Sequence, residues 1–278
     1  MSLFLVVVIG VGWVFSYVYS NPGILYIFVA ISLLMNIFSY WFSDRIVLSM
    51  YKAEPVTNES HPDLYNSVEN LAITAGLPMP KVYVIPDLQP NAFATGRNKE
   101  HAAVAVTSGL LEILNKTELE GVLAHELAHV GNRDTLISTI VVVLVGFVTL
   151  ISDFFLRSRL HFGNDRESRA GAVVMIIGIV LAILSPIVAT IIQLAISRKR
   201  EFLADATGAL LTRYPEGLAR ALEKIAAHST HPMARANNAT AHLFISNPFG
   251  NFGRGVSKLF MTHPPIEERV KILRGMNS

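Results

Sequence analysis

The sequence has no cysteine among its 278 residues. It therefore forms no disulfide, has no thiol for catalysis and must build any metal site from His, Asp and Glu. Charge is also scarce, because Asp, Glu, Lys and Arg make up 16% of the chain, against about 25% in an ordinary soluble domain. The net charge is only +2, so no basic excess indicates a nucleic-acid partner. These scarcities argue against a plain cytosolic enzyme and against nucleic-acid binding.

No charged residue precedes Asp44. Within this part, residues 3–19 and 24–42 are two apolar stretches, each about one bilayer thickness long. A Ser-Asn-Pro-Gly sequence, typical of a tight turn, separates them. The competing interpretation, a cleavable signal peptide, lacks the initial Lys or Arg and a small-x-small cleavage site. We therefore predict a transmembrane hairpin that contacts the lipid bilayer.

A second hydrophobic region lies deep in the chain. It contains two uncharged stretches, 135–152 and 170–197, which are both long enough to span a bilayer, the first only just. The loop between them carries four arginines: Arg157, Arg159, Arg166 and Arg169. Under a four-span topology this basic loop would lie outside, against the usual distribution of charge. The region 135–197 is thus either a second transmembrane hairpin, which we favour, or a segment partly embedded or packed on protein.

Positive charges near the hydrophobic stretches predict the orientation. Arg45 and Lys52 follow the first hairpin, and an Arg-Lys-Arg run at 198–200 follows the second region. Since Lys and Arg accumulate on the cytoplasmic side, we expect a multi-pass protein whose polar parts, together one domain in size, are cytoplasmic. The predicted order is a hairpin at 1–43, the first part of a catalytic domain at 44–134, a hydrophobic hairpin at 135–197 and the second part of that domain at 198–278.

Local patterns in the polar parts predict helices and a small sheet. Residues 63–75 have helical spacing, and 81–85 and 101–107 are typical of short strands, with a loop at 91–98 beside the second. A Thr-x-x-Glu capping box at 117–120 predicts the start of another helix. We expect a mostly α fold with a small β-sheet, in the α+β class, attached to about four transmembrane helices.

The predicted helix carries the motif His-Glu-Leu-Ala-His at 125–129. Residues at i and i+4 share one helix face, so His125 and His129 can bind one tetrahedral metal at about 2.0 Å. Glu126 can reach a water at the metal without being a ligand. The alternative is an amphipathic helix with two solvated histidines, but the neighbouring residues are small and apolar, where unpartnered imidazoles are costly. We therefore interpret the motif as a metal site.

A third ligand must come from elsewhere, and Glu201 is the leading candidate. It directly follows the basic run and lies one helical turn before Asp205, which can accept the free N–H of a ligating histidine. Taken alone, these two carboxylates would only offset the basic residues on an exposed helix. Together with the histidine motif, they predict one Zn²⁺ per chain held by His125, His129 and Glu201, with the fourth position open for water.

The order of these motifs, with hydrophobic stretches between the histidine pair and Glu201, resembles the HtpX-type membrane zinc metalloproteases, relatives of the CAAX prenyl proteases of eukaryotes. Segments 91–96, 239–245 and 262–269 are also similar to that family, so the resemblance covers essentially the whole chain. It implies a gluzincin-like zinc metalloendopeptidase of the bacterial cytoplasmic membrane. Such an enzyme cuts misfolded or damaged membrane proteins on the cytoplasmic side in protein quality control.

The predicted reaction assigns further roles. Glu126 takes a proton from the attacking water and passes it to the leaving amine. By its place in the Thr-His-Pro-Pro segment that resembles the family, His263 is our hypothesis for the donor that stabilises the oxyanion. Arg269 could orient His263 or the metal ligands. The same segment is also typical of a helix start whose apolar residues face the core.

The substrate cleft is predicted more loosely. Asn91 and Ala92 line it by the resemblance, and the strand at 101–107, or the loop before it, could offer an unpaired edge to an extended substrate. An ordinary buried sheet fits these residues equally well. The alternative function, from a different class, is a membrane-anchored binding or scaffold protein whose zinc is structural and closed by a fourth protein ligand. No fourth ligand is evident in the sequence, which predicts neither cleavage preference nor oligomeric state.

Overall fold

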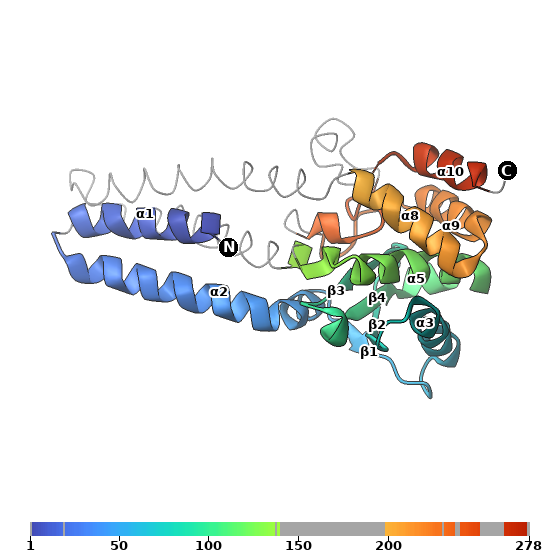
Figure 1. The fold of residues 1–278 in the computed structure, drawn as a ribbon, viewed down its shortest axis with the longest axis horizontal. Coiled ribbons are helices and arrows are strands. Elements are labelled where there is room, and N and C mark those ends of the chain that lie inside the picture. Colours follow the sequence, from blue (N-terminus) through green and yellow to red (C-terminus); the bar gives the residue numbers. More distant parts are fainter. Residues whose placement is uncertain are drawn as a thin grey trace. The chain divides into compact units, whose positions relative to one another are not determined.

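The computed structural model describes residues 2–18, 20–136, 138–139, 198–229, 231–236, 240–250 and 264–276. Most of the predicted second hairpin, 140–197, therefore lies outside the described residues, as does His263. The chain divides into two compact units, which are Met1–Ser43 with Ile140–Ile191, and Asp44–Thr139 with Ile192–Ser278. Figure 1 shows the course of the chain and the labels used below.

The first unit begins with helices α1 (Ser2–Val18) and α2 (Pro22–Met50). Phe15 stacks on Phe28 with ring centroids 5.8 Å apart, so the two helices pack together. Among the described residues, α2 alone is long and apolar enough to cross a membrane, while α1 has a shorter apolar part, Val8–Tyr17. The prediction of about four transmembrane helices is therefore not confirmed.

The end of α2 belongs to the second unit. Along most of α2 the large apolar side chains are exposed, but Val47 and Leu48 are buried, as is Tyr51 just after the helix. The Tyr51 ring packs edge-on against Phe244 and tilted against Phe93, at 5.0 and 6.1 Å between centroids. Burial raises the pKa of Tyr51 to about 12. The last residues of α2, which belong to the second unit, thus pack into the core of that unit.

A four-stranded sheet forms one layer of the second unit. Its order is β1-β2-β4-β3, with β2 and β4 parallel and the other pairs antiparallel. The strands are β1 (Glu54–Pro55), β2 (Lys81–Ile85), β3 (Ala92–Thr95) and β4 (Ala103–Thr107). All five residues of the central strand β4 are buried, so both faces of this strand are covered.

Two sequence predictions need correction here. The expected loop at 91–98 contains β3, which pairs with β4 as an edge strand of the described sheet. The strand expected at 101–107 begins only at Ala103, because 99–101 forms a 3₁₀ turn in which Asn98 Oδ1 accepts from the backbone N–H of His101 at 3.0 Å. The strand that could offer a free edge is therefore β3 and not β4.

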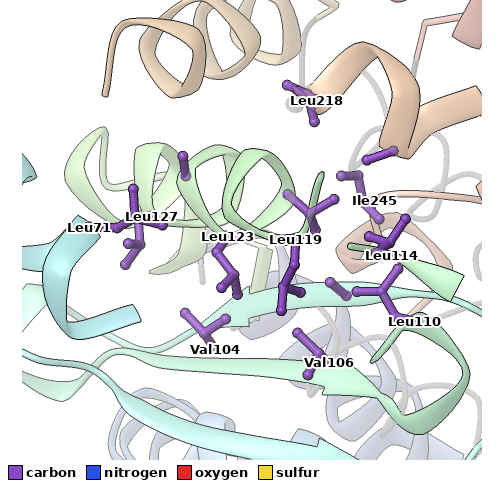
Figure 2. Packing of buried hydrophobic residues seen from close by; sticks show 14 of the residues in the cluster. Leu71, Val104, Val106, Leu110, Leu114, Leu119, Leu123, Leu127, Leu218 and Ile245 are labelled. Atoms are coloured by element: carbon purple, nitrogen blue, oxygen red, sulfur yellow. The ribbon is translucent and has the colours of Figure 1, made fainter. Parts of the chain in front are cut away.

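Helix α5 lies between the sheet and the C-terminal helices. Leu119, Leu123 and Leu127 recur every four residues, which places them on one face, and Figure 2 shows this face against Val104 and Val106 of β4. The helices of the unit are α3 (Pro62–Ala75), α4 (Ser108–Ile113), α5 (Lys116–Gly131), α8 (Arg198–Thr212), α9 (Pro215–His228) and α10 (Ile266–Gly275). The predicted α+β class with few strands is confirmed.

The capping box of α5 begins two residues earlier than predicted. Asn115 Oδ1 accepts from the backbone N–H of Glu118 at 3.0 Å, and Glu118 Oε2 accepts from the backbone N–H of Asn115 at 2.9 Å. Thr117, the predicted cap, instead donates its hydroxyl to Asn115 Oδ1. Lys224 Nζ of α9 adds an ion pair of 2.7 Å to Glu118. The start of the motif-bearing helix is therefore fixed by both capping and tertiary contacts.

We predict that Gly121→Ala destabilises the second unit. A Cβ at Gly121 would lie 2.6 Å from the backbone N of Leu218 in α9, so the helices would have to separate, at a cost of about 1–3 kcal/mol. Gly131→Ala is the matched control on α5, because its nearest atom would be a Leu77 side-chain carbon at 3.9 Å. Thermal unfolding should show a lower midpoint for Gly121→Ala alone, and equal midpoints would contradict this account of the packing.

Candidate metal centre

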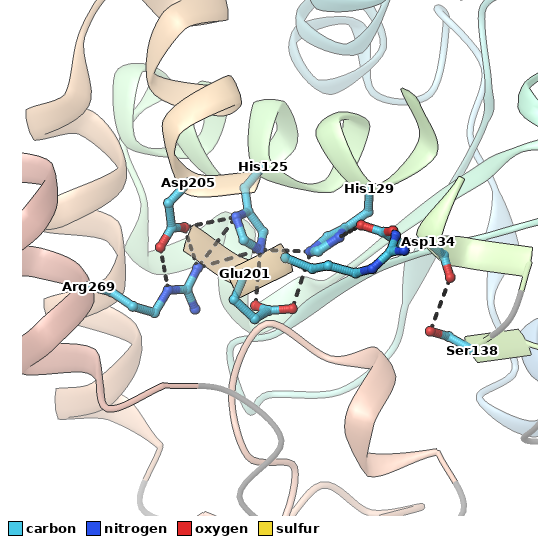
Figure 3. Close-up of polar contacts among 8 residues, drawn as sticks. His125, His129, Asp134, Ser138, Glu201, Asp205 and Arg269 are labelled. Carbon is cyan, nitrogen blue, oxygen red and sulfur yellow. Dashed lines mark hydrogen bonds and ion pairs between the residues drawn. The ribbon is translucent and has the colours of Figure 1, made fainter. Parts of the chain in front are cut away.

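Three side chains that the sequence predicts as ligands meet in the structure. His125 and His129 lie on one face of α5, and Glu201 lies in the first turn of α8. One ligand atom from each lies within 4.8 Å of the others. Figure 3 shows the three side chains pointing toward one another. His125 and Glu201 are buried, and the His129 side chain is 14% exposed. Residues that are 72 positions apart in the chain thus form one cluster because α8 packs on α5.

The distances within the cluster fit a tetrahedral metal. The two Nε2 atoms are 3.2 Å apart, His125 Nε2 is 3.8 Å from Glu201 Oε2, and His129 Nε2 is 3.6 Å from Glu201 Oε1. Bonds of about 2.0–2.1 Å at tetrahedral angles separate ligands by about 3.4 Å. The three separations scatter around that value, so the donor set and its spacing fit one small divalent ion.

Close packing of two helix backbones makes this arrangement possible. Gly208 of α8 faces α5, where an added Cβ would lie 3.0 Å from the backbone N of His125 and 3.2 Å from the carbonyl C of Ala124. A larger residue would therefore push α8 away from the histidine motif. The small residue at this crossing keeps Glu201, two turns earlier in α8, within reach of both histidines.

The outer nitrogen of His125 is held by a buried ion pair. His125 Nδ1 lies 2.9 Å from Asp205 Oδ1, as the sequence predicts. Arg269 donates from Nε and Nη2 to the two oxygens of Asp205, at 2.9 and 2.6 Å. Arg269 is fully buried, and its Nη1 has no hydrogen-bond partner among the described residues. Arg269 thus holds Asp205 in place, and its Nη2 also lies 3.4 Å from both ring nitrogens of His125. The predicted His263 lies outside the described residues.

His129 has a corresponding carboxylate that sequence reasoning missed. Its Nδ1 lies 3.1 Å from Asp134 Oδ2, and the other oxygen of Asp134 pairs with Arg200. Asp134 follows the end of α5 by three residues, and no motif connects it to the histidine. The proximity of an acidic residue to the end of the helix was the only signal in the sequence.

The surroundings give the two histidines different proton affinities. Burial and the charge of Arg269 lower the pKa of His125 to about 4, although Asp205 opposes them. Burial also lowers the pKa of His129, but Asp134, Glu201 and Glu126 outweigh it and raise that pKa to about 8. The same helix face thus carries one histidine whose proton affinity is lowered and one whose proton affinity is raised.

Glu126 is buried on α5 next to the first ligand, with 2% of its surface exposed. It lies near enough to His129 and Arg269 for its charge to raise the pKa of both groups. Burial of a carboxylate beside two imidazoles is costly unless a cation or proton compensates it. The position of Glu126 therefore also fits a metal centre.

The structure gives Asn91 a packing role that the sequence did not predict. Asn91 is fully buried; its Nδ2 donates to the carbonyl of Ser246 at 3.0 Å, and its Oδ1 accepts from the backbone N–H of Ser246 at 3.2 Å. The backbone N–H of Ile245 donates to the carbonyl of Ala92 at 3.0 Å. Residues 245–246 thus cover the start of β3, and the substrate contacts of Asn91 and Ala92 stay a prediction.

Comparisons with known proteins agree with the geometry. The model of peptidase family M48 matches residues 58–277. A "Protease HtpX homolog" of Syntrophobacter fumaroxidans is 51% identical over 269 residues, 95% of this chain and 93% of that protein. A homolog of the same name from Pyrococcus furiosus is 53% identical over 270 residues, 96% of this chain and 90% of that one. A crystal structure of Ste24p from S. mikatae shares the fold, with a TM-score of 0.55 and 22% identity, over 98% of this chain and 64% of that chain.

The two histidines and the glutamate, with a second buried glutamate beside them, place this protein among the metalloproteases. More particularly, the chain belongs to peptidase family M48, and it is similar to HtpX proteases over nearly its whole length.

Proposed function

We propose that this protein is an integral-membrane zinc endopeptidase that hydrolyses peptide bonds of misfolded or damaged membrane proteins at the cytoplasmic side of a bacterial cell membrane. The observation that carries the proposal is the convergence of His125, His129 and Glu201 on one point, with Glu126 buried beside them. Three protein ligands leave a tetrahedral ion one open position, as in catalytic zinc sites.

The residues of the chain divide the work of hydrolysis. A bound zinc ion would polarise the scissile carbonyl and lower the pKa of water toward neutrality. Glu126 takes the proton of the attacking water and delivers it to the leaving amine. Asp205, held by Arg269, keeps His125 in one tautomer and one orientation. For stabilisation of the oxyanion, the hypothesis for His263 stands as made from the sequence.

The strand β3 is our proposed binding edge for an extended substrate. It is an edge strand of the described sheet and packs against α5, which carries two of the three proposed metal ligands. The hydrogen bond from Ile245 to the carbonyl of Ala92 occupies the outer edge of β3 at its first residue. Successive residues of a strand direct their backbone N–H and C=O groups to opposite edges. The backbone groups of Ala94 therefore point to the same outer edge as those of Ala92. Main-chain pairing there would tolerate varied side chains, as a protease with many substrates requires.

The helix α2 and the distribution of charge support the proposed placement in the membrane. The helix α2 is long and apolar enough to cross a bilayer, and Arg45 and Lys52 lie near its C-terminal end. Positive residues favour the cytoplasmic side. We therefore propose a multi-pass protein whose metal centre faces the cytoplasm.

We predict that removal of the metal abolishes cleavage. The full-length protein, purified in detergent, should contain about one zinc per chain, since one set of three possible ligands is found among the described residues. Treatment with a chelator should stop hydrolysis of an unfolded protein substrate, and stoichiometric zinc should restore it. The measurements are metal content by atomic absorption and product formation by gel electrophoresis. Undiminished cleavage by the fully metal-free protein would exclude the proposed reaction.

The alternative, a scaffold protein with a structural zinc site, makes a different prediction. A structural site closes its fourth position with a protein side chain, whereas the compatible cluster among the described residues has three members. X-ray absorption of the zinc-loaded protein distinguishes the two cases. Four protein donors and no water would favour the scaffold, and three donors with one water would favour the protease.

A further inference from the structure

The Nδ1 atom of each histidine contacts an Asp side chain, which in turn pairs with an Arg. The two Asp–Arg pairs differ in how far they are exposed to solvent. Behind His125, Asp205 and Arg269 are buried, with 1% and 0% of their side chains exposed. Behind His129, Asp134 is 10% exposed and Arg200 is 46% exposed. The set behind His125 is therefore part of the core, whereas the set behind His129 lies at the surface of the unit.

Asp134 reaches His129 through a left-handed backbone conformation just after α5. At 3.6 residues per turn, a continued helix would rotate residue 134 by about 140° away from His129 and raise it along the axis. Instead, α5 ends at Gly131, and Arg133 adopts a left-handed φ of 62°. That conformation is uncommon for residues other than glycine and costs about 1 kcal/mol or more. In this conformation the Asp134 carboxylate lies 3.1 Å from His129 Nδ1.

The contact has a defined chemical effect on a ligating histidine. When Nε2 holds a metal, Nδ1 carries the proton and must donate it to an acceptor, which fixes the tautomer and the orientation of the ring. Asp134 Oδ2 is that acceptor, and the ion pair of Oδ1 with Arg200 holds the carboxylate in place. Arg200 directly precedes Glu201 in α8. The pair therefore connects the helix that carries two ligands to the helix that carries the third.

We propose that Asp134 and Arg200 are positioning residues of the metal centre, which orient His129 and join α5 to α8 beside the metal. The inference rests on the proposed zinc site and not on peptide hydrolysis. Because this pair is partly exposed, its loss should weaken metal binding more than it weakens the fold.

The test measures the zinc affinity of the full-length protein in detergent by competition with a chelator. Asp134→Ala should lower the affinity about 10- to 100-fold, as loss of a partner behind a ligating histidine commonly does. Asp134→Asn, which keeps an oxygen acceptor without charge, should lose less. Arg200→Ala should also weaken binding, and Arg200→Lys should restore part of the loss. In the cobalt-substituted protein, the visible absorption of Asp134→Ala should change, because the His129 ring is free to rotate.

Arg274→Ala is the matched control. Arg274 makes exposed ion pairs with Glu216 and Glu223, remote in sequence from the metal ligands, and its loss should leave the zinc affinity unchanged. If Asp134→Ala and Asp134→Asn both bind zinc as tightly as the parent, the inference is wrong while the proposed zinc site stands. Should Asp134→Ala fail to fold, Asp134→Asn, which has the same shape, decides alone. A parent protein that binds no zinc would overturn the proposed function itself.

Discussion

Replacement of Glu126 by Gln is expected to abolish peptide hydrolysis and to leave the zinc content unchanged. Gln has the shape of Glu but cannot take up a proton at neutral pH, and loss of a general base costs about 10²- to 10⁴-fold in rate. Glu126 is 2% exposed, so the isosteric change preserves packing. The metal ligands His125, His129 and Glu201 are untouched. The measurements are kcat on an unfolded protein substrate and zinc per chain.

Glu120→Gln provides the control for this experiment. Glu120 lies on the same helix, half-buried and outside the ligand cluster, so its replacement should leave kcat unchanged. Cleavage by Glu126→Gln at the rate of the parent would show that Glu126 is not the general base. Loss of zinc from Glu126→Gln would show instead that this residue helps to hold the metal.

Replacement of Arg269 by Leu is expected to cause the largest loss of stability. Arg269 is fully buried and makes two hydrogen bonds to Asp205, and removal of one partner from a buried ion pair costs about 3–5 kcal/mol. Burial raises the pKa of Asp205, but the Arg269 charge and His125 hold it well below its usual value. Without Arg269 the Asp205 carboxylate loses the two hydrogen bonds that hold it in place, so the orientation of His125 becomes less fixed. The midpoint of thermal unfolding and the affinity for zinc should both be lower than in the parent.

Two further variants separate the cause. In the double variant Arg269→Leu with Asp205→Asn, no unpaired carboxylate remains buried, so part of the lost stability should return. Lys271→Ala, two residues along α10 and exposed, should leave the unfolding midpoint close to that of the parent. If Arg269→Leu unfolds at the temperature of the parent, the ion pair does not stabilise the unit.

The residues of the candidate metal site were predictable because such a site needs side chains at a fixed spacing. The i and i+4 histidines identify themselves on any helix, and Glu201 with Asp205 one turn later fits a ligand and its neighbour. The structure brings all four together. Asp134 was not predictable in this way, because its position depends on the left-handed turn at Arg133. Glycine usually occupies such left-handed positions, and an arginine does not predict one.

Smaller errors have similar physical causes. Asn115 and Thr117 are both good helix caps, and the choice between them was made by tertiary contacts such as the ion pair of Glu118 with Lys224. The short strand β3 (Ala92–Thr95) has small residues and little alternation, so only its pairing with β4 reveals it. The predicted fold was therefore most reliable where local chemistry decides, and least reliable where distant segments decide.

The helix α2 has a further consequence for experiments on the isolated catalytic unit. Its 29 residues extend about 43 Å at 1.5 Å per residue, whereas a hydrocarbon core is only about 30 Å thick. Phe42 is 39% exposed, but Val47 is fully buried. Large apolar side chains are therefore exposed before this point in the helix and buried after it. The first residue of a water-soluble fragment should therefore be chosen within the one helical turn between Phe42 and Val47. A start before Phe42 retains exposed apolar side chains of the candidate membrane span, and a start after Val47 removes part of the core.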